Sequence, residues 1–182
     1  MYISEIRISN FRCFLDETAI QFNDGINVII GHNNSGKSNL LKALSLLFNP
    51  NESKKLTIDD FNKRITEAQI RSSPPKIVIT AVLKESKDES LYSDDLVVVS
   101  TWLTKLEKPY EAKLTYEFYL PESDHAAYFE MIAKIESGKV DECWKVLKED
   151  FIRKYTHKLF VGDPAYKTIS DPGILQYFDF QF

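Results

Sequence analysis

Apolar and polar residues alternate along the first thirty residues in a way that predicts three strands. The first is expected over residues 2–9, with Ile6 and Ile8 on one face, and the second over residues 19–22. Residues 26–30 are apolar at almost every position, which is typical of a strand buried on both faces. The chain therefore begins with a pattern of strands.

A helix is predicted after residue 38, because apolar residues recur there at helical spacing. It ends at Asn49-Pro50, since proline cannot continue a helix. Asn23-Asp24-Gly25 is typical of a hairpin turn before the third strand. Residues 51–75 are polar and loop-like, with a short helix expected over 57–65. The apolar positions of the long helix are Leu40, Leu41, Leu44, Leu47 and Phe48.

The middle of the chain returns to strand-like alternation. The pattern covers residues 77–84, recurs over 96–104 and again over 110–118, which predicts an antiparallel meander. The acidic, serine-rich segment 85–95 is expected to be the exposed connection between the first two of these strands.

Helical periodicity follows the meander. One apolar stripe runs from Tyr128 to Ile135, Gly138 interrupts it, and a second runs from Val140 to Tyr155. Such stripes are usually core, with a seam to a partner helix as the alternative. Residues 177–182 alternate as a strand with no polar tail, so we expect the chain to stop inside a sheet.

Composition sets broad limits. The 182 residues allow one domain with a core, and 43% hydrophobic and 27% charged residues are ordinary for a soluble chain. No apolar stretch approaches the roughly 18 residues of a membrane span, and the first residues lack the apolar region of a signal peptide. A cytoplasmic protein without membrane association is therefore expected.

Cysteine and histidine residues indicate no metal cluster. Cys13 and Cys143 are far apart and fit a reducing compartment, and His32, His125 and His157 are scattered. These residues are not expected to form a metal site.

The net charge of −4 does not indicate a nucleic-acid-binding surface. A local basic stripe remains open, because residues 145–158 contain several lysine and arginine residues. The solvated face of a helix is the favoured interpretation of that segment.

The most informative segment is residues 31–38, which read Gly-His-Asn-Asn-Ser-Gly-Lys-Ser. Gly-x-x-x-x-Gly-Lys-Ser is the phosphate-binding loop pattern, and it lies here between an expected strand and an expected helix. That arrangement directs backbone N–H groups and a helix N-terminus at an anion. The alternative, an unrelated glycine-rich turn before a core helix, has no other support in the chain.

Each position of the loop has a chemical role. Gly31 and Gly36 allow sharp turning and close approach to phosphate, and Lys37 places a positive charge against the β- and γ-phosphates. Ser38 is the expected Mg²⁺ ligand, and Lys37 is the expected catalytic residue. The expected nucleotide-binding residues of the loop are Gly31, Asn33, Asn34, Ser35, Gly36, Lys37, Ser38 and Asn39.

The sequence lacks the acidic element that a nucleotide hydrolase needs in addition to the phosphate-binding loop. Such enzymes need an apolar strand that ends in an acidic residue, to hold Mg²⁺ and polarise water. Asp59-Asp60 and Asp141-Glu142 are acidic pairs, but neither follows such a strand. Hydrolysis by this chain alone is therefore not expected.

Residues 6–14 (Ile-Arg-Ile-Ser-Asn-Phe-Arg-Cys-Phe) together with 25–39 resemble the opening of ABC-type ATPases of the SMC and RecF kind. Within that group they look most like the OLD (overcoming lysogenization defect) nucleases. The resemblance is strong over residues 1–50 and looser through Asp59-Asp60-Phe61 and the meander. It implies that Arg12 contacts phosphate or base, with an exposed turn arginine as the alternative.

The resemblance implies an α/β fold with a mixed sheet: the N-terminal portion of a P-loop ABC-ATPase head, with an antiparallel β-lobe and a helical insertion. The expected divisions are a core over 1–75, the β-lobe over 76–120 and, over 121–182, a helical insertion that returns to the core sheet. ATP and Mg²⁺ are the implied cofactors, and a homodimer of heads and DNA are the implied partners. The signature loop, Walker B strand and switch histidine of such ATPases, and the Toprim domain of OLD proteins, do not occur in this sequence.

Two functions follow from the resemblance. The favoured one is the ATP-binding portion of an OLD-like ATP-dependent DNA endonuclease. The alternative is a RecF-like or SMC-like ATPase that binds DNA without cutting it. A small-molecule kinase is disfavoured, because its substrate and lid motifs have no place in the early β-lobe.

Overall fold

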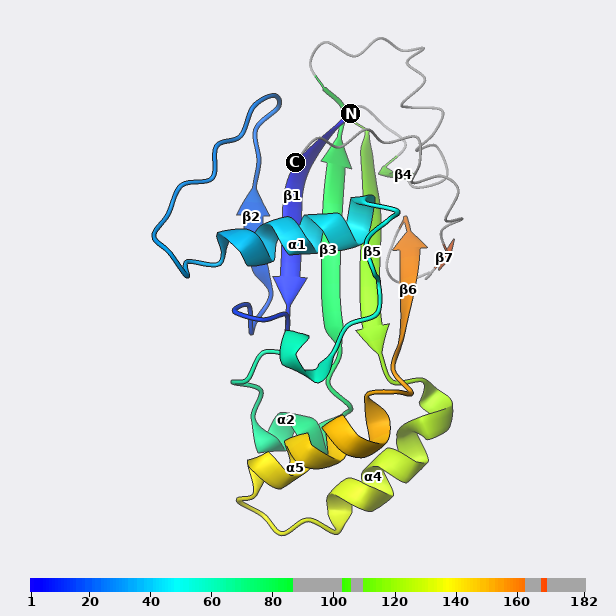
Figure 1. The fold of residues 1–182 in the computed structure, drawn as a ribbon. Helices are drawn as coiled ribbons and strands as arrows, with labels where there is room; N and C mark the ends of the chain where they lie inside the picture. Colours follow the sequence, from blue (N-terminus) through cyan, green and yellow to red (C-terminus); the bar gives the residue numbers. More distant parts are fainter. Residues whose placement is uncertain (87–102, 106–109, 163–167, 170–182) are drawn as a thin grey trace.

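The computed structural model describes residues 1–86, 103–105, 110–162 and 168–169. Their strands form one antiparallel sheet in the order β2-β1-β3-β5-β6-β7, with β4 paired to β5 (Figure 1). The strands are β1 (Tyr2–Ser9), β2 (Thr18–Gln21), β3 (Ile77–Lys84), β4 (Leu103–Lys105), β5 (Glu111–Tyr119), β6 (Thr156–Val161) and β7 (Thr168–Ile169).

The register of the sheet aligns apolar residues into rows. Ile6 lies opposite Ala81, Ala81 opposite Leu114, and Leu114 opposite Val161. All four are buried. Because side chains alternate between the two faces of a strand, this register places the apolar set of each strand on one common face.

Helix α1 (Lys37–Phe48) lies across that sheet (Figure 1). Its leucine-rich pattern buries one side of the helix, as the spacing predicts. The predicted end at Asn49-Pro50 is confirmed, because Asn49 is the C-cap. The buried residues of α1 are Leu40, Ala43, Leu44, Leu46, Leu47 and Phe48.

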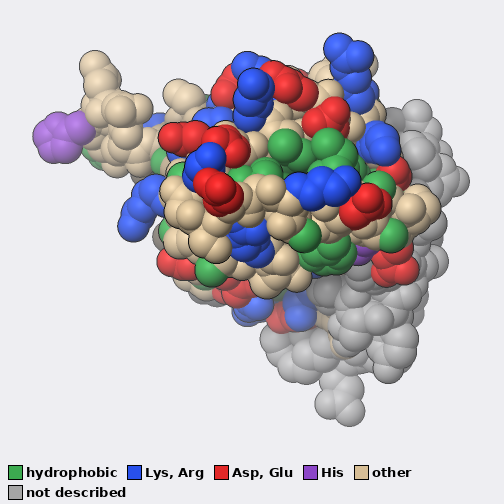
Figure 2. Space-filling model, turned by 90° about the horizontal axis from the view of Figure 1, so that it is seen from below, with side chains coloured by type: hydrophobic (Ala, Val, Ile, Leu, Met, Phe, Trp, Pro, Cys, Tyr) green, Lys and Arg blue, Asp and Glu red, His purple; other side chains and the backbone are tan. Residues whose placement is uncertain are grey.

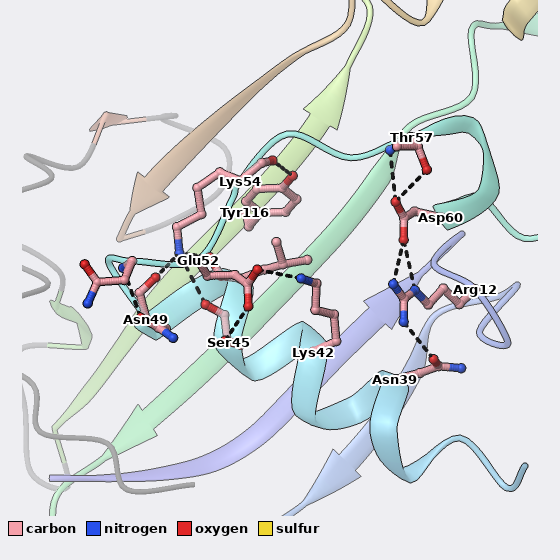
Figure 3. A network of polar contacts seen from close by, with 12 residues as sticks. Arg12, Asn39, Lys42, Ser45, Asn49, Glu52, Lys54, Thr57, Asp60 and Tyr116 are labelled. Carbon is pink, nitrogen blue, oxygen red and sulfur yellow. Dashed lines mark hydrogen bonds and ion pairs between the residues drawn. The ribbon is translucent and has the colours of Figure 1, made fainter.

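The end of α1 is fixed by Lys54 (Figure 3). Its ammonium donates to the carbonyls of Ser45, Leu46 and Asn49 at 3.2, 2.7 and 2.7 Å, which satisfies acceptors that a helix end leaves unpaired. Burial lowers the pKa of Lys54 to about 8, although the nearby Glu52 carboxylate acts in the opposite direction.

Three helices gather beyond one end of the strands: α2 (Glu67–Ser72), α4 (His125–Ala133) and α5 (Val140–Val146) (Figure 1). Helix α5 continues as a π-helical turn, η4 (Leu147–Phe151). The two predicted apolar stripes are confirmed as largely core, because Tyr128, Ile132, Leu147 and Phe151 are all buried.

Arg71 joins these helices. Its guanidinium donates to the carbonyl of Ile132 in the last turn of α4 and to those of Ile135 and Glu136 just beyond it, at 2.8–3.0 Å. Its Nε pairs with Glu67 at 2.7 Å, and the other oxygen of Glu67 accepts from the Gly138 amide.

We expect Arg71→Ala to lower the free energy of unfolding by about 2 kcal/mol, because it leaves carbonyls and a carboxylate without their charged donor. Denaturant unfolding measures this change. Lys134→Ala is the matched control: its pair with Glu130 has side chains 69% and 74% exposed, so the loss should be near zero. Equal losses from both substitutions would contradict the assigned role of Arg71.

The expected strand over residues 26–30 is not formed. These residues pair with no strand of the described chain, and Ile26, Val28 and Ile30 are 94%, 76% and 88% exposed. Residues 23–27 form no hairpin; instead the Asn27 side chain bonds the backbone of Asn23 and Gly25. An apolar run favours a strand only where a neighbouring strand can pair with it. The sheet is therefore antiparallel throughout its described part, where a mixed sheet was expected.

Other segments differ in detail. The short helix expected over 57–65 is a single 3-10 turn, η1 (Ile58–Asp60), and α2 follows it. Strand β6 begins directly after the second apolar stripe and was not predicted. A second 3-10 turn, η3 (Glu122–Asp124), precedes α4. Most of the predictions for 85–104 and all of 177–182 lie outside the described residues, and the three-part division of the chain stays a prediction.

The surface at the helical end mixes charges of both signs around a group of hydrophobic side chains (Figure 2). Lys139 pairs with Glu136 and Glu142, and Lys154 pairs with Asp124. Within residues 145–158, Lys145, Lys148, Arg153 and Lys154 are exposed, as expected for a solvated face, whereas Lys158 lies on strand β6. None of the helices in the described parts has the length and apolar character that crossing a membrane requires.

Candidate functional site

The predicted phosphate-binding loop leads directly into the first turn of α1. Residues 33–39 line an open hollow of about 280 Å³. The helix start has no side-chain cap and no acidic residue in its first turn. Its first amide groups therefore have no capping side chain, and the positive end of the helix dipole faces the loop. This arrangement suits an anion.

Two glycines allow the shape of the loop. Gly36 has φ +94°, and a Cβ there would lie 2.9 Å from the Cys13 sulfur, so a side chain would be strained and obstructed. A Cβ at Gly31 would meet the Ser35 hydroxyl at 2.7 Å. Asn34 also adopts a left-handed conformation, with φ 67°. Gly36 is thus required by its backbone conformation, whereas the contact at Gly31 is only with the end of the Ser35 side chain. The phosphate-binding roles expected for both glycines stay predictions.

Lys37 folds back over the loop. Its ammonium donates to the carbonyl of His32 at 2.6 Å, contacts the Gly31 carbonyl, and lies 3.4 Å from the Ser35 hydroxyl. The positive charge of Lys37 is thus held over the residues that precede the helix. A polyphosphate in the hollow would replace these carbonyls as its partner.

Ser38 lines the same hollow and is exposed. Its hydroxyl fits an Mg²⁺ that arrives with phosphates, because this ion takes few protein ligands and keeps several waters. No carboxylate lines the hollow within the described residues. Those residues also contain no cluster of three or more His, Cys, Asp or Glu side chains that could hold a metal ion.

Arg12 lies beside the first turn of α1 (Figure 3). Its Nη1 donates to the Asn39 side chain at 3.2 Å, and its Nε and Nη2 both lie 2.9 Å from one Asp60 oxygen. Asn39 in turn donates to the Cys13 sulfur at 3.2 Å. The structure thus brings the predicted Arg12 and Asn39 into direct contact.

The two acidic residues of the 59–60 pair have different surroundings. Asp60 is buried and bonded to Arg12 and Thr57, whereas Asp59 is exposed and paired with Lys63. The hollow that Asp59 lines is formed with α5 residues and contains no loop residue. Neither aspartate is therefore placed as the acidic partner of the loop.

Sequence reasoning did not assign Asp60, Thr57 or Cys13 to this region. Arg12 and Asp60 are 48 positions apart, so no local pattern could indicate that they pair. The one signal in the sequence that pointed to Asp60 was the family resemblance, because that resemblance includes the segment Asp59-Asp60-Phe61.

The antiparallel sheet, helix α1 that lies across it and the glycine-bounded loop before α1 define a P-loop nucleotide-binding protein. The chain belongs to the AAA ATPase domain family, whose pattern matches residues 1–171. The predicted ATPase class and α/β fold class are thereby confirmed. The narrower assignment to OLD proteins stays a prediction.

Several curated proteins are similar over the start of the chain. A Plasmodium falciparum structural maintenance of chromosomes protein 3 homolog is 51% identical over 47 residues, which is 26% of this chain and 4% of that protein. A Pyrococcus abyssi DNA double-strand break repair Rad50 ATPase is 52% identical over 44 residues, 24% of this chain and 5% of that protein. An Oceanobacillus iheyensis DNA replication and repair protein RecF is 37% identical over 97 residues, 48% of this chain and 26% of that protein.

The matched part of the chain thus spans between 4% and 26% of the length of these relatives. The structure is also similar to a solved structure from a study of ATP-driven dimerization and DNA-stimulated activation of SMC ATPases. The superposition covers 85% of this chain and 90% of that chain, with a TM-score of 0.40 and 15% sequence identity.

Proposed function

We propose that this chain is the ATP-binding portion of a RecF-like or SMC-like ATPase that acts on DNA. The observation that carries the proposal is the loop itself: an uncapped helix start, a glycine in left-handed conformation and Lys37 all border one hollow. Backbone N–H groups, helix dipole and ammonium then act together on the phosphates. Mg²⁺ would be held by Ser38 and the phosphates.

The link to DNA is taken from the relatives, which are named for chromosome maintenance, DNA replication and DNA repair. A homodimer of ATPase heads and a cytoplasmic location belong to the same proposal. An OLD-like DNA endonuclease is a second candidate, supported by the likeness of residues 1–50 and 59–61 to that family. Features outside these 182 residues would distinguish the two: a Toprim-type acidic cluster would favour the nuclease, and long heptad repeats would favour the SMC class.

Binding without turnover is expected for the 182-residue chain. The loop supplies ground-state contacts to phosphate, but no described carboxylate lies at the loop to stabilise the in-line transition state. Calorimetry with Mg²⁺ and a non-hydrolysable ATP analogue should detect binding, and phosphate release should stay at background. Robust hydrolysis would show that a catalytic carboxylate lies within this chain.

Cys13 offers a direct report of loop occupancy. It is exposed and packs against Gly36, whereas Cys143 is buried and burial raises its pKa, so a thiol reagent should label Cys13 selectively. We expect Mg²⁺-ATP to slow labelling about tenfold at ten times its Kd, because only the free loop reacts. Mass spectrometry of the modified peptide measures the rate.

Adenosine is the matched control for this experiment, because it lacks the phosphates that the loop would hold. It should leave the labelling rate of Cys13 unchanged. Equal protection by adenosine and Mg²⁺-ATP would contradict phosphate binding at the loop.

A further inference from the structure

We propose that Asp60 is a positioning residue that holds Arg12 beside the first turn of α1, where the guanidinium contacts the nucleotide phosphates. The inference deepens the proposed function and rests on it. It assigns a purpose to an acidic residue that is distant from the loop in sequence and does not line the hollow at the loop.

The Asp60 carboxylate is fully engaged (Figure 3). One oxygen accepts from Nε and Nη2 of Arg12, and the other accepts from the Thr57 amide at 2.9 Å and its hydroxyl at 3.1 Å. The contacts with Thr57, at the start of η1, prevent the carboxylate from rotating. The oxygen that accepts from Arg12 is therefore held in a fixed position facing the guanidinium. A side chain that accepts at only one oxygen could not make both sets of contacts.

The backbone reinforces this contact. The Arg12 amide donates to the Asp60 carbonyl at 2.8 Å, and the Asn62 amide donates to the Asn10 carbonyl at 3.0 Å. Asn10 and Arg12 both adopt positive φ, at 57° and 49°, which is costly for residues with a Cβ. Such a turn persists only where its surroundings hold it, and here segment 57–62 lies against it.

The geometry leaves Arg12 able to bind an anion. Its side chain is 36% exposed, whereas that of Asp60 is 12% exposed. Asp60 takes the N–H of Nε and one N–H of Nη2, and Asn39 takes one N–H of Nη1. The second N–H group of Nη1 and that of Nη2 therefore have no acceptor assigned among the described residues. Asn39 belongs to the first turn of α1, so the guanidinium is placed at the helix end that the loop phosphates would occupy.

The test compares Asp60→Asn with Asp59→Asn in the 182-residue chain. Both remove one carboxylate, but Asp59 is exposed and contacts Lys63 instead. Calorimetry with Mg²⁺ and a non-hydrolysable ATP analogue measures the Kd, and thermal unfolding reports folding. We expect Asp60→Asn to weaken binding about tenfold and Asp59→Asn to leave it unchanged.

A double-mutant cycle separates positioning from general destabilisation. Arg12→Ala should also weaken binding, and Arg12→Ala combined with Asp60→Asn should bind no more weakly than Arg12→Ala alone, because Asp60 acts through Arg12. Effects that multiply in the double variant, or a folded Asp60→Asn chain that binds like the wild type, would overturn the proposal.

Arg12→Lys keeps the test decisive if Asp60→Asn does not fold. It retains the charge but cannot bond Asp60 and Asn39 together as the planar guanidinium does, so it should weaken binding as much as Arg12→Ala. Wild-type binding by Arg12→Lys would overturn the positioning role. Failure of the wild-type chain to bind the analogue would instead overturn the proposed function.

Discussion

Replacing Lys37 with alanine should weaken binding of a non-hydrolysable ATP analogue by about 100-fold. Lys37 is the charged side chain that folds over the loop, and its ammonium now lies on the carbonyls of Gly31 and His32. With phosphate present, that ammonium exchanges carbonyl oxygens for anionic ones, which form stronger hydrogen bonds. Alanine removes this gain and leaves the backbone N–H groups, the helix dipole, Ser38 and the proposed contact from Arg12.

Lys42→Ala is the matched control, because Lys42 lies on the same helix and carries the same charge. Lys42 pairs with Glu52 at 2.6 Å, and its hydrogen bond lowers the pKa of the Glu52 carboxyl. It does not line the hollow. Calorimetry should show near wild-type affinity for this variant. If Lys37→Ala kept the wild-type Kd while Lys42→Ala lost it, the loop would not be the phosphate site.

The loop and α1 could be predicted because their signals are local. Gly36 and Lys37 belong to a short motif, and the leucines of α1 repeat every three or four residues. Strands β1, β3 and β5 could be predicted for the same reason, since alternation along one strand indicates which residues face the core.

Features that depend on distant partners could not be predicted in this way. The apolar run over 26–30 has the composition of a buried strand, but composition does not specify which strand pairs with it. Likewise, nothing near Arg12 in the sequence indicates Asp60, and nothing near Gly36 indicates Cys13. Each of these contacts arises only when the turn after β1, η1 and the start of α1 come together.

Phe61 lies where these elements meet, and Phe61→Ala should lower the free energy of unfolding by about 3–5 kcal/mol. Phe61 is 1% exposed. The centroid of its ring lies 6.0, 6.1 and 5.6 Å from the ring centroids of Phe118, Trp144 and Tyr155. It therefore connects the sheet with α5 and the segment before β6. Truncation removes these contacts and leaves a cavity, because the sheet and the helix cannot both move inward to fill it.

For a chain of this size, that loss corresponds to a fall in Tm of about 10 °C, which scanning calorimetry can measure. Phe129→Ala is the matched control, since Phe129 is 39% exposed and should cost about 1 kcal/mol or less. Phe61 also forms a backbone bridge with Phe11, next to Arg12, so its loss should loosen the turn that presents the guanidinium. A Phe61→Ala chain that kept both the Tm and the nucleotide affinity of the wild type would contradict this packing. It would mean that the turn after β1 is held without the aromatic cluster beneath it.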